Sequence, residues 1–276
     1  MVSAESSRGV PLEPDYLEPV VIRMLARQLR DRELTTQPGV PLTELYPQLG
    51  LEDAYRIQLE YIALREAEGA RVVGHKVGCT NKLLQAQFGI NQPDYGHILD
   101  AMVLSDGAKV SAASLIKPRI EPELAFVLSR TLKGPNVNAL DVLNATRWVL
   151  PCFEIIDSRI QDWCITIEDT VADNGSSSSV ILGNQPHEVN GTDLRSLGVV
   201  IEVNGTVAGT GAGAAVLGHP AQSVAWLANA LAPLGRQLQV GHIVLSGALT
   251  PSIEVNAGDV VYADFGVFGV IRCQFT

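Results

Sequence analysis

The 276-residue sequence predicts an α+β protein, with a helical region over residues 1–70 followed by a larger, mostly-β domain over residues 71–276. Two observations predict this class: apolar residues recur at helical spacing before Gly69, and short β-rich runs dominate after it. These runs do not alternate regularly with helices, which argues against a doubly wound sheet or a TIM barrel. The chain is long enough to bury a core without disulfides or a structural metal.

The N-terminal region is expected to contain two helices. Residues 1–15 are polar and carry prolines, so we expect them to form a loose arm. The first helix is expected from Asp15 to about Leu34 and the second from Glu52 to Glu68, because apolar side chains fall on one face of each. A Pro/Gly stretch separates the helices, and Gly69 would cap the end of the second.

The domain after Gly69 is expected to hold most of the strands and two further helices. Asn204-Gly205 lies between two β-rich runs and is a strong signal for a two-residue hairpin. The helices are expected near Ala139–Val149, with Asn138 as N-cap, and near Ala221–Leu231. The expected strands are Val72–Val77, Ile98–Leu104, Ile120–Leu128, Phe153–Ile156, Val180–Leu182, Val199–Val207, Ile243–Leu245, Val260–Phe265 and Val267–Cys273.

Composition and charge exclude several classes of protein. The 20 Lys and Arg residues against 30 Asp and Glu give a net charge of −10, and without a basic cluster we expect no nucleic-acid binding. No apolar run approaches the roughly 18 residues of a membrane span, and the N-terminus lacks the apolar core of a signal peptide. The four cysteines form no C-x-x-C pair, so we expect reduced core thiols in a cytoplasmic protein.

Three glutamates are the first candidates for chemistry. In a strand, Glu121 and Glu123 would project from one face, where two carboxylates repel each other unless a cation lies between them. Pro122 between them cannot donate a ladder hydrogen bond, which predicts an edge strand or a bulge. Glu154 adds a carboxylate in an apolar run. Three glutamates without a converging His or Cys would select Mg²⁺ or Mn²⁺, although solvent-facing strand glutamates have the same pattern.

Two further polar residues could act on a substrate or be structural. Lys76 lies inside an apolar strand between Gly74 and Gly78. A desolvated lysine can serve as acid, base or nucleophile, whereas a lysine on an edge strand extends to solvent. Asp94 lies in a Pro-Asp-Tyr-Gly segment that also fits simple turn chemistry.

Seven segments of the sequence form a distinctive ordered set. They are GHKVGCTN (74–81), PDYGHI (93–98), PRIEPELAF (118–126), EIIDSRIQDW (154–163), DTVADN (169–174), GTGAGAAVLGHP (209–220) and VLSGALTP (244–251). In this order they resemble the 2-keto-4-pentenoate hydratase and 4-oxalocrotonate decarboxylase family of the fumarylacetoacetate hydrolase superfamily, from about residue 14 to the C-terminus. The resemblance implies a mixed β-sandwich or roll of the fumarylacetoacetate hydrolase C-terminal type, preceded by a helical region.

The resemblance also implies a set of site residues. Glutamates at the positions of Glu121, Glu123 and Glu154 would hold Mg²⁺ or Mn²⁺. Lys76 and Asp94 match positions associated with acid–base chemistry.

Two other residues are expected near the substrate. Ser176 lies in a stretch that the resemblance places there, and His75, beside Lys76, is a candidate substrate contact. Both regions depart from the family pattern, because His75 replaces a residue that is more often aromatic or of another polar type, and Gly175 is followed by four serines. These departures leave the size of the substrate open.

The resemblance implies a hydro-lyase that adds water to 2-hydroxypenta-2,4-dienoate, giving 4-hydroxy-2-oxopentanoate in aromatic meta-cleavage catabolism. Residues 157–174 resemble hydratases more than decarboxylases. Four alternatives stay open: a 4-oxalocrotonate (2-oxohex-3-enedioate) decarboxylase, a hydratase of the longer 2-oxohept-3-ene-1,7-dioate, an acylpyruvate hydrolase, and a silent keto-acid-binding assembly partner. A homo-oligomer is also implied, and a complex with a related decarboxylase or hydratase would fit.

Overall fold

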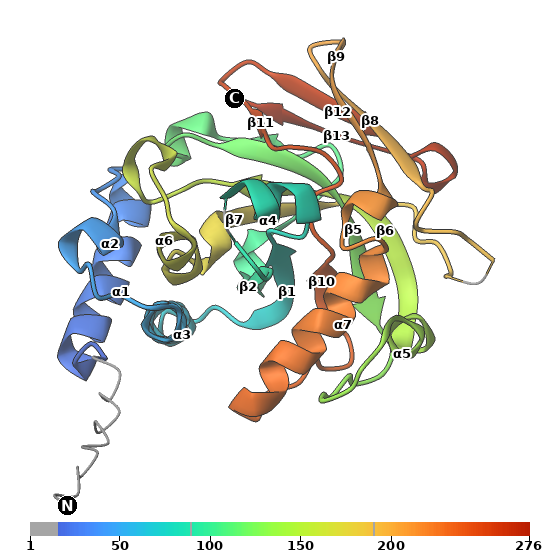
Figure 1. Cartoon of the computed structure of the whole chain (residues 1–276). Helices are drawn as coiled ribbons and strands as arrows, with labels where there is room; N and C mark the ends of the chain where they lie inside the picture. Colours follow the sequence, from blue (N-terminus) through green and yellow to red (C-terminus); the bar gives the residue numbers. More distant parts are fainter. Residues whose placement is uncertain (1–15, 89, 190) are drawn as a thin grey trace, which may run out of the picture.

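The described part of the chain forms two β-sheets and the helices that pack around them (Figure 1). The computed structural model describes residues 16–88, 90–189 and 191–276, so the expected arm over residues 1–15 lies outside the described residues. The larger sheet has eight strands, β1 (Val72–Gly78), β2 (Asp94–Leu99), β3 (Val103–Ser105), β5 (Arg119–Leu128), β6 (Thr146–Ile156), β7 (Ser177–Leu182), β10 (Ile243–Leu245) and β11 (Ile253–Glu254).

The strands of the larger sheet run in the order β2-β1-β10-β5-β6-β7-β3, with β11 also paired to β5. The second sheet has the order β4-β13-β12-β8-β9. The predicted hairpin joins β8 to β9, and its residues Asn204 and Gly205 have φ of +53° and +76°, the left-handed values that a type I′ turn needs. The second sheet comprises β4 (Lys109–Val110), β8 (Gly198–Val203), β9 (Thr206–Ala212), β12 (Val260–Asp264) and β13 (Val270–Phe275).

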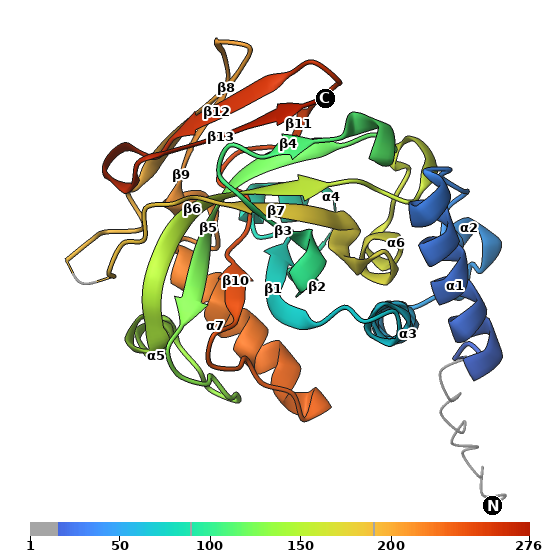
Figure 2. The same cartoon turned by 180° about the vertical axis from the view of Figure 1, so that it is seen from behind.

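Helices lie on both sides of the larger sheet, as the two opposite views show (Figures 1 and 2). The N-terminal helix α1 packs against α3, and α3 packs against α6, while α7 packs against α5. The two expected N-terminal helices are confirmed as α1 and α3, and the division of the chain near residue 70 stays a prediction. The helices are α1 (Pro19–Thr35), α2 (Leu42–Leu45), α3 (Leu51–Ala67), α4 (Lys82–Phe88), α5 (Ala139–Ala145), α6 (Ile167–Ala172) and α7 (Pro220–Leu231).

Two hydrophobic clusters fill the two faces of the larger sheet. Leu124 and Phe126 of β5 belong to the cluster shared with the second sheet and α7. Ala125 between them belongs to the cluster shared with the N-terminal helices. Side chains alternate along a strand, so Glu121 and Glu123 share the face of Ala125, toward the N-terminal helices. The α+β class, with mixed sheets and an N-terminal helical region, is confirmed.

Several predicted element boundaries were wrong. The helix expected over Ala139–Val149 begins as predicted, with Asn138 as N-cap, but ends at Ala145. The next residues, Thr146 to Val149, include β-branched and aromatic side chains that favour a strand, and β6 begins there. The strand expected over Ile98–Leu104 is interrupted by a 3₁₀ turn at Asp100–Met102.

The prediction of an edge or bulge at Pro122 was also wrong. Strand β5 is central, paired with β6 along its length, with β10 at residues 125–127 and with β11 at residues 119–120. Pro122 lies in the gap between β10 and β11, where its carbonyl accepts a hydrogen bond from the Leu249 N–H at 3.0 Å. A proline fits there because no neighbouring strand needs its missing N–H.

The cysteines lie in different environments. All four are free thiols, as expected. Cys152 and Cys273 are buried, but Cys79 is half-buried and Cys164 is exposed, so the expectation of core thiols was wrong for Cys164. Cys164 follows a 3₁₀ turn at Gln161–Trp163, which leaves it outside the strands that form the core. Among the described residues, no helix is long and apolar enough to cross a membrane.

Candidate functional site

Three carboxylates from two neighbouring strands form the centre of the site. Glu121 of β5 lies directly opposite Glu154 of β6 in the antiparallel ladder, and Glu123 follows two residues later on the same face. One oxygen from each of the three carboxylates lies within 4.8 Å of the others. Glu154 is 0% exposed and Glu123 is 1% exposed, while Glu121 is half-buried. Like charges directly opposite one another destabilise a sheet, so this arrangement requires compensating positive charge.

The electrostatics of the three glutamates fit a divalent cation. Burial, and then the charge of Glu154, raises the pKa of Glu121 and of Glu123. Burial also raises the pKa of Glu154, against the opposing effect of the Lys76 ammonium. Neither carboxylate oxygen of Glu154 has a hydrogen-bond partner within the described residues. Carboxylate oxygens are the ligands that Mg²⁺ and Mn²⁺ prefer, and a bound cation could be coordinated by the Glu154 oxygens.

Lys76 and Asp94 join the carboxylates from the other side of the site. Lys76 is buried on β1, with Nζ 3.6 Å from Glu154 Oε2. Burial alone lowers the pKa of Lys76, but the surrounding carboxylates, Glu154 foremost, raise it above its usual range. Asp94 begins β2 and pairs with Gly78 of β1. Asp94 Oδ2 lies 3.5 Å from the Cys79 thiol, and Oδ1 has no partner among the described residues.

Glycines provide the space that Lys76 and Asp94 occupy. A Cβ on Gly78 would overlap the Asp94 carboxylate and lie 3.1 Å from Lys76 Nζ, and a Cβ on Gly175 would lie 3.0 Å from the same Nζ. These positions therefore bring two chain segments, from β1 and from the turn before β7, close to one ammonium group.

The end of β10 explains why the site lies at this place in the sheet. β10 separates β1 from β5, but it ends at Leu245, and the chain then turns away. In that turn, the Gly247 N–H donates a hydrogen bond of 2.8 Å to Glu123 Oε2. The end of β10 leaves room for Lys76 to extend past it toward Glu154.

The predicted residue Ser176 belongs to a neighbouring network. Its hydroxyl donates to Asp173 Oδ2 at 3.0 Å, and Asp173 forms a buried ion pair with Arg159. The next serine, Ser177, is the one whose side chain lowers the pKa of Glu154, although its Oγ forms no hydrogen bond among the described residues. Ser177 was not predicted, because the run of four serines contains no spacing that could separate it from Ser176.

His75 lies away from the carboxylates. It is adjacent to Lys76 on β1, so its side chain projects from the opposite face of the sheet. There its ring centroid is 4.9 Å from that of His97. The structure thus brings together Glu121, Glu123, Glu154, Lys76 and Asp94, and it does not bring Ser176 or His75 into contact with them.

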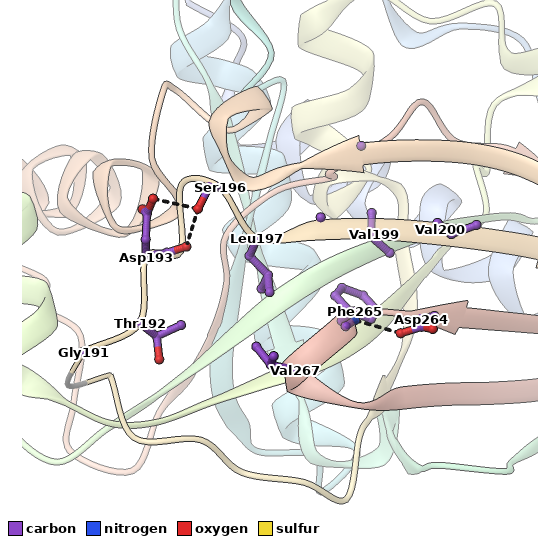
Figure 3. A pocket seen from close by; sticks show the side chains of 13 residues that line it. Gly191, Thr192, Asp193, Ser196, Leu197, Val199, Val200, Asp264, Phe265 and Val267 are labelled. Atoms are coloured by element: carbon purple, nitrogen blue, oxygen red, sulfur yellow. Dashed lines mark hydrogen bonds between the residues drawn. The ribbon is translucent and has the colours of Figure 1, made fainter.

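A cavity of about 650 Å³ lies by the second sheet, and none of the predicted site residues lines it (Figure 3). Its wall includes Asp193, Ser196 and Phe265, and the Ser196 hydroxyl is bonded to the Asp193 carboxylate at 2.7 Å. This cavity therefore offers no link to the carboxylate centre.

Comparison with known proteins identifies the family. Residues 72–276 match the fumarylacetoacetate (FAA) hydrolase C-terminal family. The chain belongs to this family. It is 48% identical, over 86% of its length and 90% of the relative's, to a 2-hydroxyhexa-2,4-dienoate hydratase of Comamonas testosteroni. It is 45% identical, over 79% of its length and 99% of the relative's, to a 2-hydroxypent-2,4-dienoate hydratase of Pseudomonas putida.

The family fold is also found in a solved structure that holds a metal. A 4-oxalocrotonate decarboxylase from Pseudomonas putida G7, complexed with magnesium and adipate, superposes with a TM-score of 0.92 at 37% identity, covering 94% of this chain and 99% of that one. The expected family, the hydro-lyase type of enzyme and the divalent-metal cofactor are thereby confirmed.

Proposed function

We propose that this member of the fumarylacetoacetate hydrolase family adds water to 2-hydroxypenta-2,4-dienoate, giving 4-hydroxy-2-oxopentanoate in the catabolism of aromatic compounds by meta-cleavage. The observation that carries the proposal is the buried group of three glutamates facing Lys76 and Asp94. Relatives that are named hydratases of five- and six-carbon 2-hydroxydienoates support this choice of substrate class.

Glu121, Glu123 and Glu154 would hold Mg²⁺ or Mn²⁺. The bound ion would stabilise the negative charge that develops on the C2 oxygen of the substrate. The half-buried position of Glu121 makes it the member of the group nearest to an entering substrate. The burial of the other two carboxylates keeps water away and strengthens their interaction with the cation.

Lys76 and Asp94 are suited to the two proton transfers of the reaction. As the dienol becomes a ketone, its C2 hydroxyl loses a proton and its carbon chain gains one, after which water adds at C4. The carboxylates around Lys76 keep it protonated, so its ammonium can donate a proton. The unpartnered Oδ1 of Asp94 can accept a hydrogen bond and thereby orient Lys76 or the attacking water.

Decarboxylation is the second candidate reaction. The chain is 43% identical, over 85% of its length, to a 4-oxalocrotonate decarboxylase of Pseudomonas sp. (strain CF600), and the Pseudomonas putida G7 decarboxylase has nearly the same fold. Both reactions need a stabilised enolate, so the three glutamates serve either one. The shape of the region that receives the far end of the substrate must decide between them.

The ultraviolet absorbance of 2-hydroxypenta-2,4-dienoate tests the proposal. We expect rapid loss of absorbance with protein and Mg²⁺, formation of 4-hydroxy-2-oxopentanoate, and only spontaneous ketonisation in EDTA. Glu121→Gln should abolish the metal-dependent turnover, while Glu44→Gln, at an exposed position of α2, should not. Full activity in EDTA would contradict the metal mechanism, and release of CO₂ from 4-oxalocrotonate with no hydration of the dienoate would favour the decarboxylase.

We also propose that the enzyme forms a cytoplasmic homo-oligomer and can associate with a related decarboxylase or hydratase. The exposed face of the second sheet supports an oligomer, because it carries the partly exposed valines Val200, Val260 and Val270. The four free thiols support a reducing compartment. Light scattering of the purified protein would give the mass of the particle, and a monomer would contradict the proposal.

A further inference from the structure

A second cavity lies on the face of β1 opposite Lys76, and it is independent of the proposed function. It has a volume of about 560 Å³ and lies between α3, the end of α7 and the segment that leads into β10. We propose that this cavity binds a small carboxylic acid with a short aliphatic chain, with its carboxylate against Arg236 and its chain against α3.

Three histidines and an arginine line one part of the cavity. The ring centroid of His75 lies 4.9 Å from that of His97 and 5.5 Å from that of His242. A guanidinium nitrogen of Arg236 lies 3.5 Å from His97 Nε2. These side chains thus lie close together in the lining, and the Arg236 guanidinium supplies hydrogen-bond donors for an oxygen anion.

Two cations line this cavity without forming an ion pair in the part of the chain that the structure describes. Among the described residues, no carboxylate forms an ion pair with Arg236 or with Lys133, which also lines the cavity. Glu66 is the one acidic residue in its described lining. The two cations therefore lie beside one cavity without a carboxylate bonded to either, and an anionic ligand would interact favourably with both.

Two of the histidines also have unused hydrogen-bonding atoms. His75 is 5% and His97 is 2% exposed, and the Nδ1 atoms of both lack a hydrogen-bond partner within the described part of the chain. Burial, and then the charge of Arg236, lowers the pKa of His97 to about 3, so its ring is neutral near pH 7. A neutral imidazole offers one N–H donor, and which nitrogen carries it can adjust to a bound oxygen.

Another part of the lining is apolar, which favours an anion with a hydrocarbon chain. Leu59, Ile62 and Ala63 of α3 line it together with Val72 and Leu231. A bare phosphate would leave these apolar side chains facing water, whereas a short aliphatic chain would bury them. A transition metal fits poorly, because Arg236 repels it and the described histidines do not bring three nitrogens within 4.8 Å of one another.

Isothermal titration of the full-length, Mg²⁺-loaded protein with hexanoate tests the proposal. We expect saturable binding, tighter than that of acetate by at least about tenfold, because hexanoate has four more methylene groups to bury. Arg236→Gln should weaken hexanoate binding by about tenfold or more, since a charge-assisted hydrogen bond is lost. Arg236 is exposed, so this variant should fold. Arg27→Gln, at an exposed position of α1, is the matched control and should leave binding unchanged.

Several outcomes would overturn the proposal. Hexanoate binding that is equally tight in Arg236→Gln would place the ligand elsewhere, including at the Mg²⁺ centre. Inorganic phosphate binding more tightly than hexanoate would contradict the carboxylic-acid class, and absence of saturable binding would contradict the site itself. None of these outcomes affects the proposed hydration reaction, because Arg236 lies on the opposite side of β1 from Lys76.

Discussion

The Lys76 ammonium neutralises part of the negative charge of the site, and it also competes with a metal ion for Glu154. Its Nζ is 3.6 Å from Glu154 Oε2, and both side chains are buried. Buried ion pairs of this kind gain little net stability, because both charges lose their hydration. Its position beside a group of three carboxylates is therefore better explained by chemistry than by folding.

Replacing Lys76 by methionine separates these two roles. We expect Lys76→Met to lower kcat by about 10²–10⁴-fold, the usual contribution of a positioned proton donor. The affinity for Mn²⁺ should stay equal or increase, because a cation that competes for Glu154 is removed. Turnover and Mn²⁺ binding, followed by electron paramagnetic resonance, measure the two effects, and Lys109→Met, at an exposed position, is the control. Loss of Mn²⁺ binding in Lys76→Met would show that Lys76 supports the centre structurally.

His97 makes a pH-dependent contribution to stability. Burial and then Arg236 lower its pKa in the folded state to about 3, whereas an unfolded histidine has a pKa near 6.5. Between these values the unfolded state binds more protons, so the free energy of unfolding rises with pH and the stabilisation is lost as the pH falls below 6.5. Relative to His97→Gln, the wild type should lose up to about 1.4 kcal/mol per pH unit in this window. Urea unfolding at several pH values measures it, and parallel curves would contradict the assignment.

At the scale of the elements, the sequence predicted the individual strands better than it predicted which strands pair with one another. The alternation of β5 predicted that Glu121 and Glu123 share a face, because this depends on local geometry alone. The pairing of Glu121 with Glu154 depends on the register of β5 against β6, which no local pattern specifies. The approach of Lys76 to Glu154 depends on a feature far away in the sequence, the end of β10 at Leu245.

The same limit explains the error at Pro122 and the unpredicted hydrogen bond of Ser176. A missing N–H predicts an edge strand only when a continuous neighbour would need it, and the gap between β10 and β11 removes that need. Ser176 has a φ of +53°, a left-handed conformation that redirects the chain, and its hydroxyl binds Asp173. Neither feature could be read from the composition of the serine run.

The turn after β10 should be sensitive to a single methyl group. Gly247 has a φ of +109°, and a Cβ there would overlap Thr80. Gly258 also has a positive φ, +96°, but no atom lies near its Cβ position among the described residues. We expect Gly258→Ala to cost about 1–2 kcal/mol for the backbone conformation and Gly247→Ala to cost about 1–3 kcal/mol more for the contact. Chemical denaturation measures both, and equal losses would contradict the role of Thr80.

Gly247→Ala should also affect the metal site, because the Gly247 N–H bonds to Glu123 Oε2. Mn²⁺ affinity should fall in this variant and stay unchanged in Gly258→Ala. A loss of stability without a change in Mn²⁺ affinity would show that the turn can shift without moving Glu123.

At the scale of the whole molecule, the larger sheet separates two regions of opposite charge character. One face collects carboxylates and needs a cation, while the other, behind β1, collects histidines and unpaired cations. The net charge of −10 hides this separation, because composition gives only a sum. Strand β1 carries Lys76 toward one face and His75 toward the other, so both regions depend on the same strand.

The carboxylate face predicts that a divalent cation stabilises the whole fold. A ligand that binds only the folded state at 100 times its Kd adds about 2.7 kcal/mol. This corresponds to roughly 5–11 °C in Tm for chains of about 150–250 residues, and we expect the lower end of that range for this chain of 276 residues. Thermal unfolding in Mg²⁺ and in EDTA measures this shift, with NaCl at equal ionic strength as the control for simple screening of the net negative charge. Glu154→Gln should lose the shift and Glu44→Gln should retain it. An equal shift in Glu154→Gln, or in NaCl alone, would mean that the cation acts on the surface charge instead of at the three buried glutamates.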